Sequence, residues 1–194
     1  MIAGHFGLAA AVKAREPRVP LWALMLATQW LDVVFVPLYL AHVEGLVPVA
    51  GTGGGYGNAV IHADYTHSLV GAVVLAALFA LPALWRWGRR PALVLAAVVF
   101  SHWTLDLVVH RHDMPLLPGA PAGSPTVGFG LWRHSTAAAI AELGLVLWGA
   151  YSYWRAAVAT TRTREPARLG RAHVAAAALL LSGLVTLAFD LRGA

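Results

Sequence analysis

Three ionisable residues recur at helical spacing inside an apolar part of the chain. His102, Asp106 and His110 stand at positions i, i+4 and i+8 of the apolar stretch 91–110. A helix would place all three on one face. Imidazole and carboxylate groups that project between helices are how helical bundles build metal sites. The spacing therefore predicts a polar site along this face.

Two other apolar stretches contain ionisable residues that are costly in a hydrocarbon layer. Asp32 lies in the first of them, one helical turn after Gln29, which could hydrogen-bond a ligand from behind. His134 and Glu142 are eight residues apart in a later stretch, so one helical face would present both. Such groups normally face a partner or a water-filled cavity. Glu142 could alternatively make a structural bond to a neighbouring helix.

The composition is that of an integral membrane protein. Of the 194 residues, 59% are hydrophobic and only 12% are charged, far from the balance in soluble domains. The chain has no cysteine, so any metal site must use His, Asp and Glu. The net charge of +5 comes from basic clusters between apolar runs, a pattern that encodes topology and does not favour nucleic-acid binding.

Five apolar segments are long enough to cross a bilayer, which needs about 20 mostly apolar residues. We therefore predict an all-α integral membrane protein with about five transmembrane helices, in which residues 1–194 form a single domain. The predicted spans are 20–41, 68–85, 91–110, 131–154 and 172–190.

The basic residues also predict the orientation of the chain. All but three of the 14 lysines and arginines precede the first span or lie in the loops 86–91 and 155–171. Basic loops stay in the cytoplasm, so the loops 42–67 and 111–130 are expected on the other side. The predicted location is a bacterial-type inner membrane, with the lipid bilayer as a partner.

The apolar segment formed by the first dozen residues is too short to span the bilayer alone. We predict that residues 2–16 form a short helix, which turns back near Arg18 and packs as a hairpin with the first span. At about 1.5 Å per residue, His5 and Asp32 would then reach similar depth. The alternative is an interfacial amphipathic helix that leaves His5 at the cytoplasmic surface.

In the predicted orientation most histidines gather at the extracytoplasmic face, and only His173 lies with the basic loops. The gathered residues are His42, His62, His67, His102, His110, His112 and His134.

Simpler interpretations exist for several polar residues near these ends. His62 could be a loop or cap residue, and Asp64 or Thr66 could cap the second span. Arg111 and Asp113 could form a solvated ion pair of small energetic weight.

Several motifs resemble those of the bacterial inner-membrane metal-dependent hydrolases, a family whose first described member is LexA-regulated. HADYTHSL (62–69) and FSHWTLDLVVHRHDMPLLPG (100–119) follow an opening Gly-His and an acidic motif in the family's order, over residues 4 to 120. The chain departs from the family at Ala63-Asp64, where an Arg-Gly pair is usual. It departs again after Asp32, which Val33 and Val34 follow instead of a second Asp and a His. The matching residues are Gly4, His5, Asp32, His62, Thr66, His67, Ser68, Ser101, His102, Asp106 and the loop residues 115–118.

The resemblance implies a membrane-embedded, metal-dependent hydrolase. Its core metal ligands would be His67, His102 and Asp106, and the additional candidates are His5, Asp32 and His62. A His and carboxylate ligand set suits a divalent ion, zinc before manganese or iron.

Three residues are candidates for moving protons during such a reaction: His110, His134 and Glu142. The site would lie in the outer leaflet beneath the Gly- and Pro-rich loops. The expected substrate is therefore an amphiphilic (phospho)ester, such as a phospholipid or a lipid phosphate.

Two other classes of function use similar residues. Intramembrane His and Asp also serve metal-ion or proton transport, although the sequence shows neither an inverted repeat nor a broken helix, which are common in transporters. Bis-histidine haem ligation by His67, His102 or His134 is a further alternative.

Overall fold

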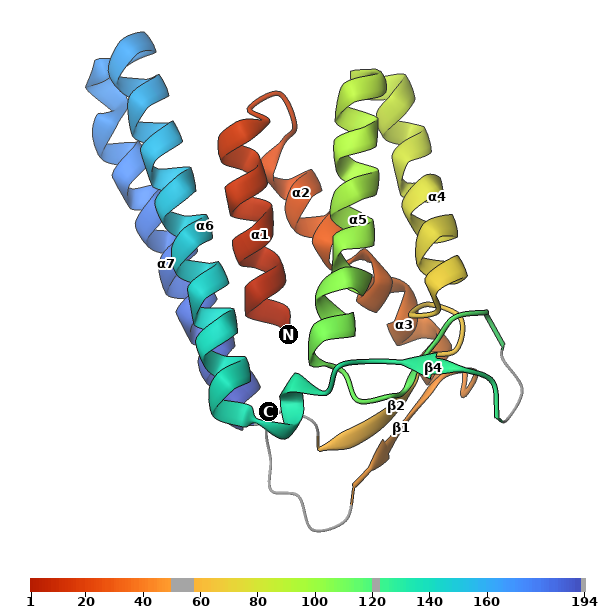
Figure 1. The fold of residues 1–194 in the computed structure, drawn as a ribbon. Helices are drawn as coiled ribbons and strands as arrows, with labels where there is room; N and C mark the ends of the chain where they lie inside the picture. The colour runs from red at the N-terminus through yellow and green to blue at the C-terminus, as the bar shows by residue number, and fades with distance from the viewer. Residues whose placement is uncertain (50–57, 120–122, 193–194) are drawn as a thin grey trace.

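The computed structural model describes residues 1–49, 58–119 and 123–192, and in these ranges the chain is mainly helical (Figure 1). This confirms the predicted all-α class. The helices are α1 (Ile2–Arg15), α2 (Leu21–Thr28), α3 (Trp30–Leu40), α4 (Leu69–Trp87), α5 (Arg89–Val109), α6 (Ser135–Arg164) and α7 (Leu169–Arg192).

Short strands and turns collect at the two ends of the helices. Two antiparallel pairs lie together at one end, and the turns α1–α2, α4–α5 and α6–α7 lie at the opposite end (Figure 1). Parts of the Gly- and Pro-rich loops, residues 50–57 and 120–122, fall outside the described residues. The pairs are β1 (Gly45–Pro48) with β2 (Ala59–His62) and β3 (Met114–Pro115) with β4 (Thr126–Val127); the 3₁₀ turns are η1 (Leu131–Arg133) and η2 (Pro166–Arg168).

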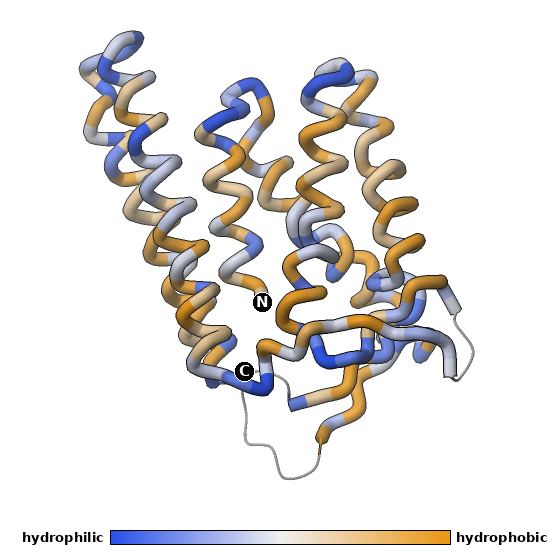
Figure 2. The backbone as a smooth tube through the Cα atoms, in the orientation of Figure 1, coloured by the Kyte–Doolittle hydropathy of each residue, from blue (hydrophilic) through white to orange (hydrophobic). Residues whose placement is uncertain are grey.

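Fewer helices are long and apolar enough to span a membrane than the five predicted. Within the described residues they are α4, α5 and α7 with its preceding turn, and the bent pair α2–α3 makes a fourth if it counts as one span. The predicted span 131–154 overlaps the first part of α6, where Glu142, glycines and serines lower the hydropathy. Hydrophobic residues dominate the middle of the helices, as a membrane protein requires (Figure 2).

The segment predicted as one straight span, 20–41, is instead two helices bent by 50° at Gln29. Gln29 leaves the helical conformation, and its N–H donates to Leu26 O in a tight turn. The carbonyl of Thr28 accepts a hydrogen bond from His102 Nδ1 at 2.6 Å, a partner on another helix. The bend therefore satisfies a side chain of α5 and sets the direction of α3.

The α1 helix turns back into α2, as the predicted hairpin requires (Figure 1). Lys13 Nζ closes the turn by donating to the carbonyls of Pro17 and Val19, at 2.9 and 2.8 Å. Glu16 forms an ion pair with Arg90 at the start of α5. His5 is 1% exposed, so α1 is not an interfacial helix with His5 at the surface.

Glycines let α1 approach α6 at backbone distance. A Cβ atom on Gly7 would overlap the carbonyl of Leu145, and one on Gly149 would overlap the carbonyl of Gly7. Small residues permit such close packing of membrane helices. Fully buried Glu142 accepts a hydrogen bond at 2.9 Å from Gly4 N–H, which the first turn of α1 leaves free. The α6 helix therefore holds the segment that contains His5.

We predict that Gly149→Ala destabilises the protein by about 1–3 kcal/mol, because the methyl group has no room. Gly144→Ala, on the same helix, is the matched control, since a Cβ there meets nothing within 4 Å. The control should be neutral or slightly stabilising. Thermal denaturation of both purified variants in detergent measures the difference. Equal stabilities would contradict the close approach of the two helices.

Candidate metal centre

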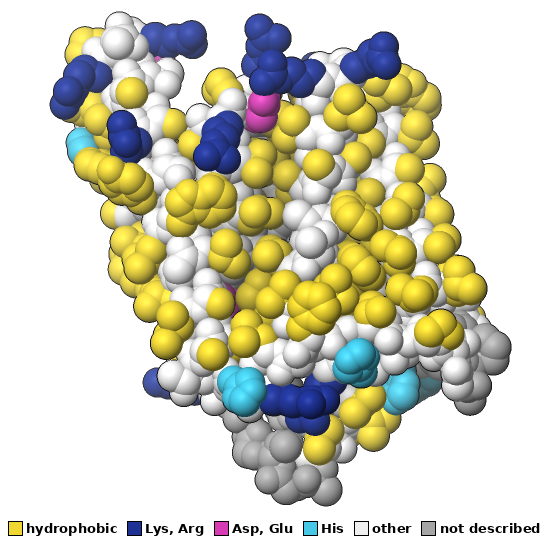
Figure 3. Space-filling view, in the orientation of Figure 1, with side chains coloured by type: hydrophobic (Ala, Val, Ile, Leu, Met, Phe, Trp, Pro, Cys, Tyr) yellow, Lys and Arg dark blue, Asp and Glu magenta, His cyan; other side chains and the backbone are white. Residues whose placement is uncertain are grey.

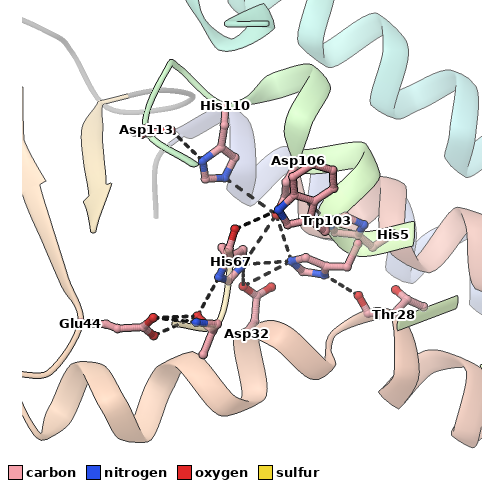
Figure 4. A network of polar contacts seen from close by, with 11 residues as sticks. His5, Thr28, Asp32, Glu44, His67, Trp103, Asp106, His110 and Asp113 are labelled. Atoms are coloured by element: carbon pink, nitrogen blue, oxygen red, sulfur yellow. Dashed lines mark hydrogen bonds and ion pairs between the residues drawn. The ribbon is translucent and has the colours of Figure 1, made fainter. Parts of the chain in front are cut away.

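Polar side chains from four segments meet in a pocket of about 470 Å³. Its histidines and carboxylates are His5, Asp32, His67, His102, Asp106 and His110 (Figure 4). A larger cavity, of about 570 Å³, lies between α1, α2, α6 and α7 and is lined by no histidine or carboxylate among the described residues. The smaller pocket is therefore where metal or acid–base chemistry is possible.

Helix termini and helical spacing bring these residues together. Asp32 lies in the first turn of α3, just after the bend. His67 precedes α4, whose N-cap Ser68 accepts a hydrogen bond from Gly71 N–H at 3.0 Å. Ser68 is thus the cap, and neither Asp64 nor Thr66 has that role. His102 and Asp106 lie one turn apart on α5.

The buried carboxylate of Asp106 lies at the centre of the cluster. Its Oδ1 is 3.2 Å from His5 Nε2. Its Oδ2 is 3.0 Å from His102 Nε2, 3.7 Å from His67 Nε2 and 3.8 Å from His110 Nε2. Four imidazoles therefore converge on one carboxylate. They come from α1, from α5 and from the segments that adjoin α4 and α5.

Asp32 adds a second carboxylate on the pocket side of the cluster. Its Oδ1 is 3.4 Å from His67 Nε2 and 3.6 Å from His102 Nε2. Two sets of donor atoms each lie within 4.8 Å of one another: His5, His102 and Asp106, and Asp32, His67 and His102.

Hydrogen bonds assign the orientation of the two central imidazoles. His102 Nδ1 faces the carbonyl of Thr28, which only accepts, so Nδ1 carries the proton. His67 Nδ1 lies 2.9 Å from Thr66 Oγ1. The Thr66 hydroxyl donates its proton to Glu44, so it accepts from His67 Nδ1. Both Nε2 atoms therefore point into the cluster, 3.3 Å apart.

Glu44 is a buried partner that the sequence did not reveal. It is 4% exposed and accepts from Thr66 Oγ1 at 2.9 Å and from the N–H groups of Tyr65 and Thr66 at 2.8 Å. It thereby holds both the loop and the hydroxyl behind His67. No spacing rule links Glu44 to Thr66, because a strand pair and a Gly-rich segment separate them in the chain.

The donor set fits a divalent cation. Two Nε2 lone pairs face each other beside two carboxylates, an arrangement that needs positive charge between them. His5 Nδ1 is buried and has no hydrogen-bond partner among the described residues. Imidazole nitrogens and carboxylate oxygens are the ligands of zinc and related metals. These buried His and Asp groups could hold a metal ion.

The structure does not bring three of the predicted site residues to the cluster. His62 is exposed on β2, and His134 is exposed at the start of α6. Glu142 is buried at the α1–α6 contact, where it accepts from Gly4. None of the three lines the pocket.

His110 does line the pocket, and its carboxylate partner is Asp113. The sequence had suggested Arg111 as the partner of Asp113. His110 Nδ1 is 3.2 Å from Asp113 Oδ1, and Asp113 Oδ2 accepts from Ile61 N–H at 3.2 Å. The Asp113 side chain is only 8% exposed, so it is not half of a solvated pair with Arg111. The His110 ring also packs on Trp132, with 4.5 Å between centroids.

Comparisons of this chain with protein-family models, with curated proteins and with solved structures found no match.

We predict that Thr66→Val weakens divalent-metal binding about 10–100-fold, as is typical when a hydrogen-bond partner of a ligand is lost. Thr66→Ser should restore it, because serine keeps the hydroxyl between His67 and Glu44. Thr104→Val on α5 is the matched control, since Thr104 is exposed and bonds only to the Phe100 carbonyl among the contacts described. Competition with a metal-sensitive dye measures the affinities. Equal affinities for Thr66→Val and the control would reject the role of Thr66.

Proposed function

We propose that the protein is a membrane-embedded, metal-dependent hydrolase that acts on an ester of an amphiphilic substrate. The observation that carries the proposal is that the Nε2 atoms of two imidazoles, His67 and His102, each lie within 3.7 Å of both the Asp32 and the Asp106 carboxylates in a partly apolar pocket. The motif resemblance of residues 4 to 120 supports the same class of reaction.

In this proposal His67, His102 and Asp106 hold the ion, and Asp32 and His5 complete its surroundings. Zinc suits this ligand set best, with manganese and iron as alternatives. When bound, such an ion lowers the pKa of a coordinated water and polarises the oxygen of the scissile group. His62 lies outside this set, because it is exposed on β2.

His110 is the residue that we assign to proton transfer. Its Nε2 faces the pocket, and Asp113 holds its Nδ1, which fixes the ring in an orientation suited to a general base. His134 and Glu142, the other two candidates from the sequence, do not line the pocket and are not assigned this role.

The surface of the molecule supports the proposed membrane placement. Hydrophobic side chains cover the middle of the face in Figure 3, between lysines and arginines at one end and histidines with arginines at the other. We place the basic end in the cytoplasm of a bacterial-type inner membrane by the positive-inside rule. The pocket then lies in the outer leaflet, where the head group of a phospholipid or lipid phosphate resides.

Transport of a metal ion or proton is the second candidate, and the bend between α2 and α3 favours it. Discontinuous helices are common at transporter binding sites. Transport also needs a polar path to the other side. Among the described residues, the buried polar side chains lie around the cluster or at the Glu142 contact, and none continues toward the basic end. Haem ligation is disfavoured, because the Asp32 and Asp106 carboxylates lie within 3.7 Å of both Nε2 atoms, in the space that a porphyrin would need.

We predict that the purified protein contains a stoichiometric divalent metal and that His67→Ala and Asp106→Ala each lose most of it. His173→Ala is the control, because His173 contacts Trp154 far from the cluster. Inductively coupled plasma mass spectrometry measures the metal content. A folded wild-type protein that is metal-free without exposure to chelator would overturn the proposal.

Single cysteines test the orientation, because the chain has none of its own. We predict that Thr163→Cys, at the end of α6, is labelled by an impermeant maleimide only in inside-out membrane vesicles. Ser124→Cys, beside β4 at the opposite end, should be labelled only from outside intact spheroplasts. The reverse pattern would place the pocket in the cytoplasmic leaflet.

A further inference from the structure

The charge of the pocket limits which ester it can accept. Its described lining contains two aspartates and no lysine or arginine. Arg133 adjoins the lining residue Trp132, but its side chain lies over Gly130. The other polar side chains of the described lining are the clustered histidines, Gln29 and the indole of Trp132. Among the described residues, the lining of the pocket therefore contains no permanently positive side chain.

A phosphate monoester is a poor match for such a pocket. It carries a charge of about −1.5 to −2 at neutral pH, and proteins usually hold it with Arg or Lys. A divalent ion between Asp32 and Asp106 would be neutralised by these carboxylates, which leaves no net charge to attract a dianion. A carboxylic ester is uncharged and needs no such partner.

The opening of the pocket lies on the flank of a helix that is compatible with a membrane. The Asp32 side chain is 41% exposed and the Asp106 side chain only 5%, so the cluster is open on the Asp32 side. Val33 and Val36 line the pocket beside Asp32 and are 43% and 52% exposed. Both belong to the bent pair α2–α3, which is apolar enough to cross a membrane, so lipid would reach the opening.

We propose that a lipid enters the pocket sideways from the bilayer, with an acyl chain along Val33 and Val36, and that the bond cleaved is the carboxylic ester of that chain. This inference rests on the proposed hydrolase function and specifies its substrate. Water adds its oxygen to the acyl carbon, the bond from that carbon to the alcohol oxygen breaks, and the alcohol oxygen receives a proton. The products are a fatty acid and a lysolipid.

Phosphatidic acid tests the proposal, because one molecule contains both a phosphate monoester and carboxylic esters. The zinc-loaded protein is reconstituted in phosphatidylglycerol vesicles that contain phosphatidic acid, and fatty acid and inorganic phosphate are measured together. We expect fatty acid without phosphate. Phosphate without fatty acid would overturn this inference and leave the hydrolase proposal intact. If neither fatty acid nor phosphate is released, both this inference and the hydrolase proposal are overturned.

A substitution at the opening gives a second test that includes binding. Val36→Trp should reduce fatty-acid release at least tenfold. It should also reduce photo-crosslinking to a diazirine-labelled acyl chain of phosphatidic acid, measured with metal-free protein. Val73→Trp on α4 is the matched control, since Val73 is 51% exposed and Val36 is 52% exposed. Equal crosslinking in the two variants, at equal melting temperatures, would overturn the acyl-chain path.

Discussion

The buried carboxylate of Asp106 is the interaction on which the arrangement of the helices depends. A carboxylate enclosed by apolar helices is costly unless positive charge and hydrogen-bond donors surround it. The imidazoles of His5, His67, His102 and His110 surround the Asp106 carboxylate, from α1, α5 and the segments that adjoin α4 and α5. The need to compensate one charge thus joins α1, α5 and the segment before α4. A divalent cation would satisfy the same need and adds the chemistry that we propose.

Hydrogen bonds from outside the cluster fix the orientation of its two central histidines. Thr28 offers its carbonyl to His102 at the bend between α2 and α3, and Thr66 offers its hydroxyl to His67. Each of these bonds fixes a proton on Nδ1 and turns Nε2 toward the pocket. The bend and buried Glu44 therefore orient the possible metal ligands, although neither enters the donor set.

The contact between α1 and α6 holds His5 in position at the site. Glu142 resembles a catalytic acid when only its position in an apolar helix is known, but it accepts from Gly4 at the first turn of α1. Gly7 and Gly149 bring the two backbones together at the same contact. Together they hold α1 where His5 meets Asp106, so Glu142 acts on the site through the backbone.

The sequence by itself determined the helical class, the membrane character and the placement of His102 and Asp106 on one helical face, because hydropathy and periodicity are local properties. It also indicated that α1 folds back beside the first span. Only the tertiary structure decided that His5 and Asp32 join this face while His62, His134 and Glu142 do not. It alone revealed Glu44, the contact between Asp113 and His110, and the bend at Gln29. These features depend on contacts between residues distant in the chain, which no local spacing encodes.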